Sequence, residues 1–158
     1  MMTPLSLQEE YGPHGICFGC GPKNKNGLQL QSYIESSSGH IVARFLPQEH
    51  HQAFPGVLNG GIIGALLDCH SNWAAAYHLM HAQRSSSPPC TVTADYHITL
   101  KRPTPTPCEI ELRAWVKEVQ EPKAVIEATL SASGKICATC TGTFVAIGPD
   151  HPAYFRPE

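Results

Sequence analysis

The chain has 158 residues, the size of one ordinary globular domain, and a net charge of -2 that gives no reason to expect a nucleic-acid partner. Hydrophobic residues make up 42% and charged residues 15%, so the chain can bury a core and is not a disordered polypeptide. No apolar run approaches the roughly 18 residues of a membrane span. The N-terminus resembles no signal peptide and the seven cysteines are an odd number, so we expect a cytoplasmic protein.

The composition divides the chain into three parts. Residues 1–27 are rich in Gly, Pro and Asn and show no clear period, which predicts an irregular lead-in. Residues 28–148 contain all the periodic segments and are predicted to form one domain. Residues 149–158 are expected to be a C-terminal tail.

The predicted domain begins with two strands. The apolar residues Leu28, Leu30 and Ile34 indicate the first strand, and the Ser-Ser-Ser-Gly sequence at 36–39 is typical of a turn. Residues 41–46 then form the returning strand. A loop over residues 47–58 is expected to follow.

After Asn59, Gly60 and Gly61, the apolar residues follow a helical period. One stripe at three- and four-residue steps consists of Ile62, Leu66, Cys69, Trp73, Ala76 and Met80. Most other positions are also apolar, so we expect a long and largely buried helix that ends before the loop at 83–89.

The remainder of the domain shows the alternation of apolar and polar residues that strands have. Predicted strands cover residues 91–100, 110–117, 124–131 and 136–147. One helix packed on one mainly antiparallel sheet is an α+β fold. A single helix covers only one face of a sheet, so we expect a partner chain to cover part of the remaining apolar surface.

A second face of the helix combines small residues with polar ones. Gly61, Gly64, Asp68, Asn72 and Ala75 recur at three- and four-residue steps. The acid is about 10–12 Å from the helix start, too far to be an N-cap. Glycine amides at a helix start can stabilise an oxyanion, and a carboxylate can activate water or attack directly, as acyl hydrolysis requires. The alternative is a solvated or paired Asp after an ordinary Gly-Gly turn.

Residues 54–68 resemble the signature of hotdog-fold thioesterases of the PaaI and THEM type. That signature is Pro-Gly-x-x-His-Gly-Gly, with an acid seven residues after the last glycine, and Gly61 and Asp68 have this spacing. The Cys-Phe-Gly-Cys-Gly-Pro sequence at 17–22 looks like the lead-in of the same branch. The resemblance covers roughly residues 14–148.

The resemblance implies a hotdog fold, in which an antiparallel sheet wraps a central helix, and active sites at the interfaces of homodimers that can pair into tetramers. It also implies acyl-CoA substrates and no cofactor. By position, Gly60 and Gly61 would provide oxyanion-hole amides, Asp68 would be general base or nucleophile, and Thr93 would help to hold water.

The resemblance also indicates where substrate would bind. Predicted substrate-binding residues are Asn59, Phe54, His51, Asn72 and Arg102. Phe54 and the loop with His50 and His51 would line the acyl or pantetheine channel. Lys101 and Arg102 could meet the CoA phosphates, although charges near a strand end are often only solvated. The family often has His where this chain has Asn59, which can donate a hydrogen bond but cannot titrate.

Two cysteine pairs allow a zinc hypothesis. Cys137 and Cys140 fall in a predicted strand, where positions three apart point to opposite faces, so they are poor candidates. Cys17 and Cys20, with His14 nearby, are better candidates. Cys69 falls on the apolar stripe and is expected to be a small buried hydrophobic residue. We expect no metal, and near-stoichiometric zinc in the purified protein would contradict this expectation.

Three functions stay open at this point. The first is acyl-CoA hydrolysis. The second is an acyl-CoA binding or sensing domain without turnover, which the Asn at position 59 suggests. The third is a hotdog hydratase or dehydratase, whose Asp/His pair is not evident because no His is found at a matching position beside the helix start.

Overall fold

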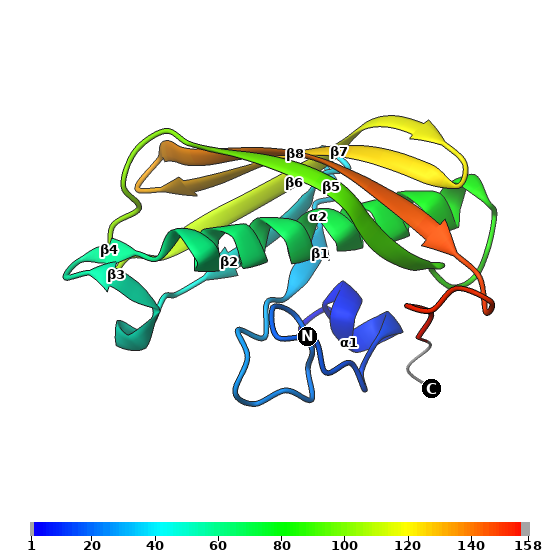
Figure 1. The fold of residues 1–158 in the computed structure, drawn as a ribbon, viewed down its shortest axis with the longest axis horizontal. Coiled ribbons are helices and arrows are strands. Elements are labelled where there is room, and N and C mark those ends of the chain that lie inside the picture. The colour runs from blue at the N-terminus through cyan, green and yellow to red at the C-terminus, as the bar shows by residue number, and fades with distance from the viewer. Residues whose placement is uncertain (1, 156–158) are drawn as a thin grey trace.

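The computed structural model describes residues 2–155 and shows one long helix lying along one face of a curved sheet (Figure 1). The elements in chain order are α1 (Leu7–Tyr11), β1 (Ser32–Ile34), β2 (Ile41–Phe45), the 3-10 turn η1 (Glu49–His51), β3 (Gln52–Phe54), β4 (Val57–Leu58), α2 (Gly60–Ala82), β5 (Cys90–Leu100), β6 (Ile110–Gln120), β7 (Lys123–Ala132) and β8 (Lys135–Ile147).

Six strands form one antiparallel sheet in the order β1-β2-β6-β7-β8-β5. The side chains that alternate inward from β6 and β7 are buried against α2, whose contribution to the core includes Leu66, Leu67 and Leu79. The lead-in with α1 lies on the opposite side of α2 from the sheet (Figure 1). This architecture confirms the predicted α+β hotdog fold, and it leaves β5 as a long edge strand.

The first strand is shorter than predicted. β1 begins at Ser32, although Leu28 and Leu30 are both buried. Their backbone N–H groups donate to Phe18 O (2.7 Å) and Gly19 O (3.0 Å) rather than to a neighbouring strand. The alternation of apolar residues therefore predicted buried positions correctly but not a strand. The backbone N–H groups of these residues bond to the lead-in loop and so cannot pair with a neighbouring strand.

The segments expected to be irregular contain two small regular units. Within residues 1–27, α1 begins at a capping box, in which Ser6 Oγ accepts from the Glu9 N–H (3.1 Å) and Glu9 accepts from the Ser6 N–H (2.9 Å). Within residues 47–58, β3 and β4 form a short hairpin. The Ser-x-x-Glu spacing at 6–9 was the available signal for the first of these units.

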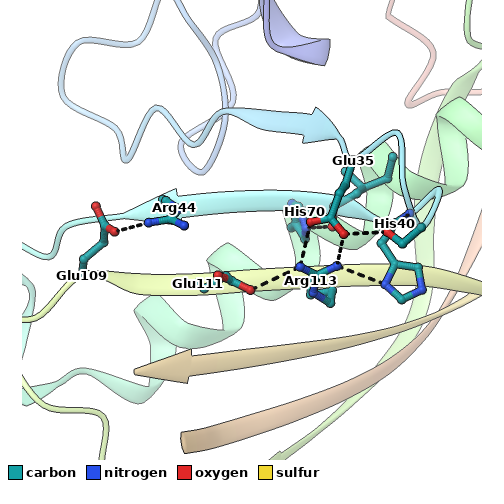
Figure 2. Close-up of polar contacts among 9 residues, drawn as sticks. Glu35, His40, Arg44, His70, Glu109, Glu111 and Arg113 are labelled. Carbon is teal, nitrogen blue, oxygen red and sulfur yellow. Dashed lines mark hydrogen bonds and ion pairs between the residues drawn. The ribbon is translucent and has the colours of Figure 1, made fainter. Parts of the chain in front are cut away.

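On the outer face of the sheet, Arg113 of β6 holds the turn between β1 and β2 (Figure 2). Its guanidinium contacts Glu35 at 2.9 Å and His40 Nδ1 at 3.3 Å. The hydrogen bonds that Arg113 donates lower the pKa of the Glu35 carboxyl to about 2. Glu111 lies 3.5 Å from the same guanidinium. This cluster ties the sheet edge to its centre.

A buried polar network joins the lead-in to the core. His70 of α2 is fully buried, and its Nε2–H donates to Ile41 O (2.9 Å), so Nδ1 accepts from Ser32 Oγ (2.8 Å). Gln8 of α1 donates to the same Ser32 Oγ (3.1 Å) and accepts from the Ser32 N–H (2.8 Å). His70 is thus a structural residue. Burial lowers its pKa to about 4.

This buried imidazole should make the free energy of unfolding decrease as the pH is lowered. The folded-state pKa of His70 lies below the usual value of 6.5, so the unfolded chain binds the extra proton. The contribution of His70 is complete above about pH 6.5 and is lost as the pH falls toward 4. We expect the free energy of unfolding, measured with urea, to lose about 2 kcal/mol between pH 7 and pH 5 through this group.

The comparison that isolates the effect uses His70→Gln, which cannot titrate, and His151→Gln in the exposed tail as the matched control. The loss of stability on acidification should shrink in the first variant and persist in the second. Equal pH dependence in wild type and His70→Gln would contradict the assignment.

Candidate active site

The helix start presents unpaired backbone donors. Asn59 is the N-cap of α2, and its Oδ1 accepts from the Ile62 N–H (3.1 Å). Gly60 and Gly61 are exposed, and within residues 2–155 no acceptor bonds to their N–H groups. A Cβ on Gly61 would lie 2.9 Å from Asn59 Oδ1, so the cap itself favours glycine there. This helix end can therefore donate hydrogen bonds to an anionic oxygen, with support from the helix dipole.

Asp68 lies two turns further along α2 and is partly buried. Thr93 of β5 donates its hydroxyl to Asp68 Oδ1 at 2.7 Å. Burial raises the pKa of the Asp68 carboxyl above its usual value, the Thr93 hydrogen bond opposes this, and the nearby Cys17 raises it further. Among the ion pairs of the described chain, none includes Asp68. A carboxylate that is oriented by a hydroxyl and not neutralised by a cation is suited to act as a base or nucleophile.

Asn72 repeats this contact one helical turn later. Its Oδ1 accepts from the Thr91 hydroxyl, and its Nδ2 donates to Thr91 O at 3.3 Å. Two successive inward residues of β5 thus bond to two successive turns of α2. Asn72 was predicted to bind substrate, and in this structure both ends of its amide contact Thr91, which holds β5 against the helix.

The amides and the carboxylate cannot meet at one reacting atom within a single chain. Gly61 and Asp68 are seven residues apart on one helix, which separates them by about 10 Å along its axis. Catalytic groups need to lie within about 3 Å of the atoms on which they act. A site that uses both groups therefore needs the helix start of a second chain.

The remaining predicted contacts do not converge in one chain. Phe54 is 71% exposed on the β3–β4 hairpin. His51 lies beside the helix start, since its carbonyl accepts from the Asn59 N–H (3.0 Å), but its ring is buried and its Nδ1 accepts from the Gln48 N–H (3.0 Å). Arg102 is exposed and donates to Ile136 O (3.1 Å). The His51 contact with the helix start runs through its backbone carbonyl, and the position that the family often fills with His holds Asn59.

A cavity that the sequence did not reveal lies next to the Asp68 region. It has a volume of about 430 Å³, opens to solvent, and is bordered by the lead-in, the middle of α2, the loop that leads into β5, the start of β5 and residues near the C-terminus. Its lining includes Tyr11, Trp73, Pro88, Val92 and Phe155, together with Asn72 and Thr91. Because Asn72 and Thr91 are one turn from the Asp68–Thr93 pair, this cavity could hold an apolar group whose reacting end lies near the carboxylate.

Three thiols meet where the lead-in crosses the same helix. Cys17 Sγ and Cys69 Sγ are 3.6 Å apart, and Trp73 Nε1 donates to Cys20 Sγ at 3.4 Å. Hydrogen bonds from the Cys20 and Cys69 thiols lower the pKa of Cys17, and the pKa values of the two donor thiols are raised in return. Cys69 is buried as predicted, but it also contacts a second thiol.

The other predicted pair behaves differently from expectation. Cys137 and Cys140 are both buried, although positions three apart on a regular strand point to opposite faces. The register of β8 against β7 shifts beside Cys137, which explains the difference. His14 is exposed and does not belong to the group formed by Cys17, Cys20 and Cys69.

Within residues 2–155, no helix has both the length and the apolar character needed to cross a bilayer.

Comparison with known proteins finds relatives that share the fold. A thioesterase superfamily protein from Shewanella loihica PV-4 is 35% identical over 75% of this chain and 91% of that chain, with a TM-score of 0.62. The PaaI protein from the phenylacetic acid degradation operon of E. coli shares the fold, with 16% identity over 77% of this chain and 81% of that chain and a TM-score of 0.64.

A curated relative is acyl-coenzyme A thioesterase THEM4 of Rattus norvegicus, which is 21% identical over 128 residues, or 80% of this chain and 51% of that protein. The chain thus spans about half the length of this relative. The sequence model of the thioesterase superfamily matches residues 55–138, which is just over half of the chain and extends from the β3–β4 turn into β8. The chain therefore belongs to the thioesterase superfamily.

Proposed function

We propose that this protein hydrolyses acyl-CoA thioesters, with Asp68 as the general base or nucleophile. The observation that supports this most is the state of Asp68, a half-buried carboxylate in the middle of a helix, oriented by Thr93 and without a cationic partner in the described chain. The curated relative named as an acyl-coenzyme A thioesterase supports the choice of CoA thioesters as substrates.

The reaction can be written from these groups. The thioester carbonyl oxygen accepts hydrogen bonds from the Gly60 and Gly61 amides at the helix start of a second chain, which stabilise the negative charge that develops there. Asp68 takes a proton from water, and the hydroxide attacks the carbonyl carbon. The C–S bond then breaks, and the CoA sulfur leaves as thiolate and accepts the proton from Asp68. The products are a free acid and CoA. Direct attack by Asp68 would lead to the same products through an anhydride that water then cleaves.

The proposed second chain would pair along β5. This strand is 11 residues long and lies at the edge of the sheet, so its outer backbone groups have no strand partner in the described chain. Tyr96 and Leu100 on it are 47% and 56% exposed, and Leu100 lies close to Gly60. A homodimer formed here, alone or within a tetramer, would cover this edge together with the start of α2. This pairing would bring the helix start of each chain close to Asp68 of the other chain.

A screen of CoA thioesters from acetyl to long-chain and aromatic tests the proposal. Released CoA thiol is measured with a thiol reagent, and we expect release from at least one class of thioester. Tight acyl-CoA binding without release from any member would instead favour a non-hydrolytic binding domain, for which Asn59, a helix cap unable to titrate, is the motivating residue.

Removal of the Thr93 hydroxyl should weaken catalysis without removing the acid. A hydrogen bond to a charged group contributes about 1.5–3 kcal/mol, so Thr93→Val should lower kcat/KM by about 10- to 100-fold. Thr93→Ser keeps the donor and should retain most of the rate. Steady-state kinetics on the best thioester measures both variants, and equal losses in Val and Ser would show that the methyl group rather than the hydroxyl matters.

A further inference from the structure

The backbone of the lead-in loop packs closely against α2 at Cys69. A Cβ on Gly19 would lie 2.3 Å from Cys69 Sγ, so only glycine lets the loop backbone approach this closely. The loop is closed by the Gly21 N–H, which donates to Cys17 O (2.8 Å). It is also fixed by the bond from the Leu30 N–H to Gly19 O (3.0 Å). The positions of Cys17 and Cys20 relative to the helix are therefore set by packing and backbone bonds.

The sulfur atoms have the spacing of ligands around one metal ion. The Sγ atoms of Cys17, Cys20 and Cys69 all lie within 4.8 Å of one another, and all seven cysteines, which fall inside the described residues, are free thiols. A tetrahedral zinc with Zn–S bonds of about 2.3 Å places its sulfur ligands roughly 3.8 Å apart. The observed Cys17–Cys69 separation of 3.6 Å is close to that edge. A disulfide would require a contact of about 2.05 Å.

The surroundings supply donors to these sulfur atoms. The indole of Trp73 donates to Cys20 Sγ at 3.4 Å, and the backbone N–H groups of Gly19 and Cys20 help to lower the pKa of the Cys17 thiol. Such outer hydrogen bonds orient thiolate ligands and stabilise their negative charge in metal sites. Two of the three thiols, Cys17 and Cys20, also line the cavity of about 430 Å³, from which a water molecule could reach a bound ion.

We propose that Cys17, Cys20 and Cys69 bind one zinc ion, with water from the cavity as the fourth ligand. This site takes no part in the proposed hydrolysis and stands on separate residues. Its metal would link the lead-in loop to α2 through a thiolate that directly follows Asp68 in the chain. The sequence had favoured no metal because it offered only a pair of cysteines in one loop, and the fold adds the third ligand from a helix 49 residues further along the chain.

Metal analysis of the full-length protein tests the site. Protein is purified under reducing conditions, and a chelator removes any bound metal. It is then titrated with zinc chloride and desalted, and the zinc content per chain is measured by elemental mass spectrometry. We expect close to one zinc per chain. Titration with cobalt(II) should produce thiolate-to-cobalt charge-transfer absorption, and zinc should displace it. The proposal would be overturned if the protein retained no zinc and showed no such absorption. It would also be overturned if the protein bound copper stoichiometrically but did not bind zinc.

Matched variants assign the ligands. Cys17→Ser changes an exposed residue and should abolish stoichiometric zinc, whereas Cys108→Ser, which changes a half-buried cysteine outside the cluster, should leave it unchanged. Alkylation of the wild-type protein followed by mass spectrometry gives a second readout, in which zinc should protect Cys17 and leave Cys108 equally reactive. Equal zinc loss in both variants, or no protection of Cys17, would overturn the assignment. A failure of thioester hydrolysis with zinc bound would count against the proposed function alone.

Discussion

Asp68→Asn is expected to lower kcat/KM for the best CoA thioester by about 10²- to 10⁴-fold, the usual contribution of a general base. Asn has nearly the same shape and can still bond to Thr93, but it cannot accept a proton from water or attack as a carboxylate. The loss should lie in kcat more than in KM, because the change removes a group that acts in the transition state. Steady-state kinetics with released thiol as readout measures it.

The control for this substitution is Asp150→Asn, which makes the same chemical change at an exposed position after β8. Its kinetics should match those of the wild type. Circular dichroism and zinc content should be unchanged in both variants. A folded Asp68→Asn or Asp68→Ala protein with the wild-type rate would exclude Asp68 from the chemistry.

Phe144→Ala is expected to lower the free energy of unfolding by about 3–5 kcal/mol, since it removes a large buried ring and leaves a cavity. Phe144 is fully buried on β8, where it pairs with Ala124 of β7 and Thr93 of β5. A Cβ on Gly142 would lie 2.8 Å from its ring, so the neighbouring glycine leaves the space that the ring fills. Urea unfolding followed by tryptophan fluorescence measures the loss.

Phe155→Ala provides the matched comparison, because its ring is 56% exposed. That substitution should change the free energy of unfolding by less than about 0.5 kcal/mol. If the two variants lost similar stability, the core assignment of Phe144 would be wrong.

Elements with a clear period were predictable from the sequence. Local patterns predicted the long helix after Asn59 and the alternating strands from residue 90 onward, and the structure has α2 and β5 to β8 in those places. The spacing from Gly61 to Asp68 is a local pattern as well. The contact between Asp68 and Thr93 joins residues on two elements. Their proximity came from the family resemblance and not from periodicity.

Features that depend on packing between distant segments were missed. The bonds from Asn72 to Thr91 follow from how β5 crosses α2, and no local pattern encodes that crossing. Leu28 and Leu30 alternate like a strand but bond to the lead-in loop. Cys69 looked like an ordinary core residue because its helical position says nothing about which loop lies over it.

The separation of about 10 Å between Gly61 and Asp68 along one rigid helix has a genetic consequence. Under the proposed pairing, each chain lends its acid to one centre and its amides to the other. Consider a dimer in which one chain lacks the acid and the other lacks the helix-start glycine. Both defects would then fall in the same active site, and the second active site would have its acid and its amides intact. Two individually inactive alleles would then complement each other, as no pair of lesions confined to a single-chain site could do.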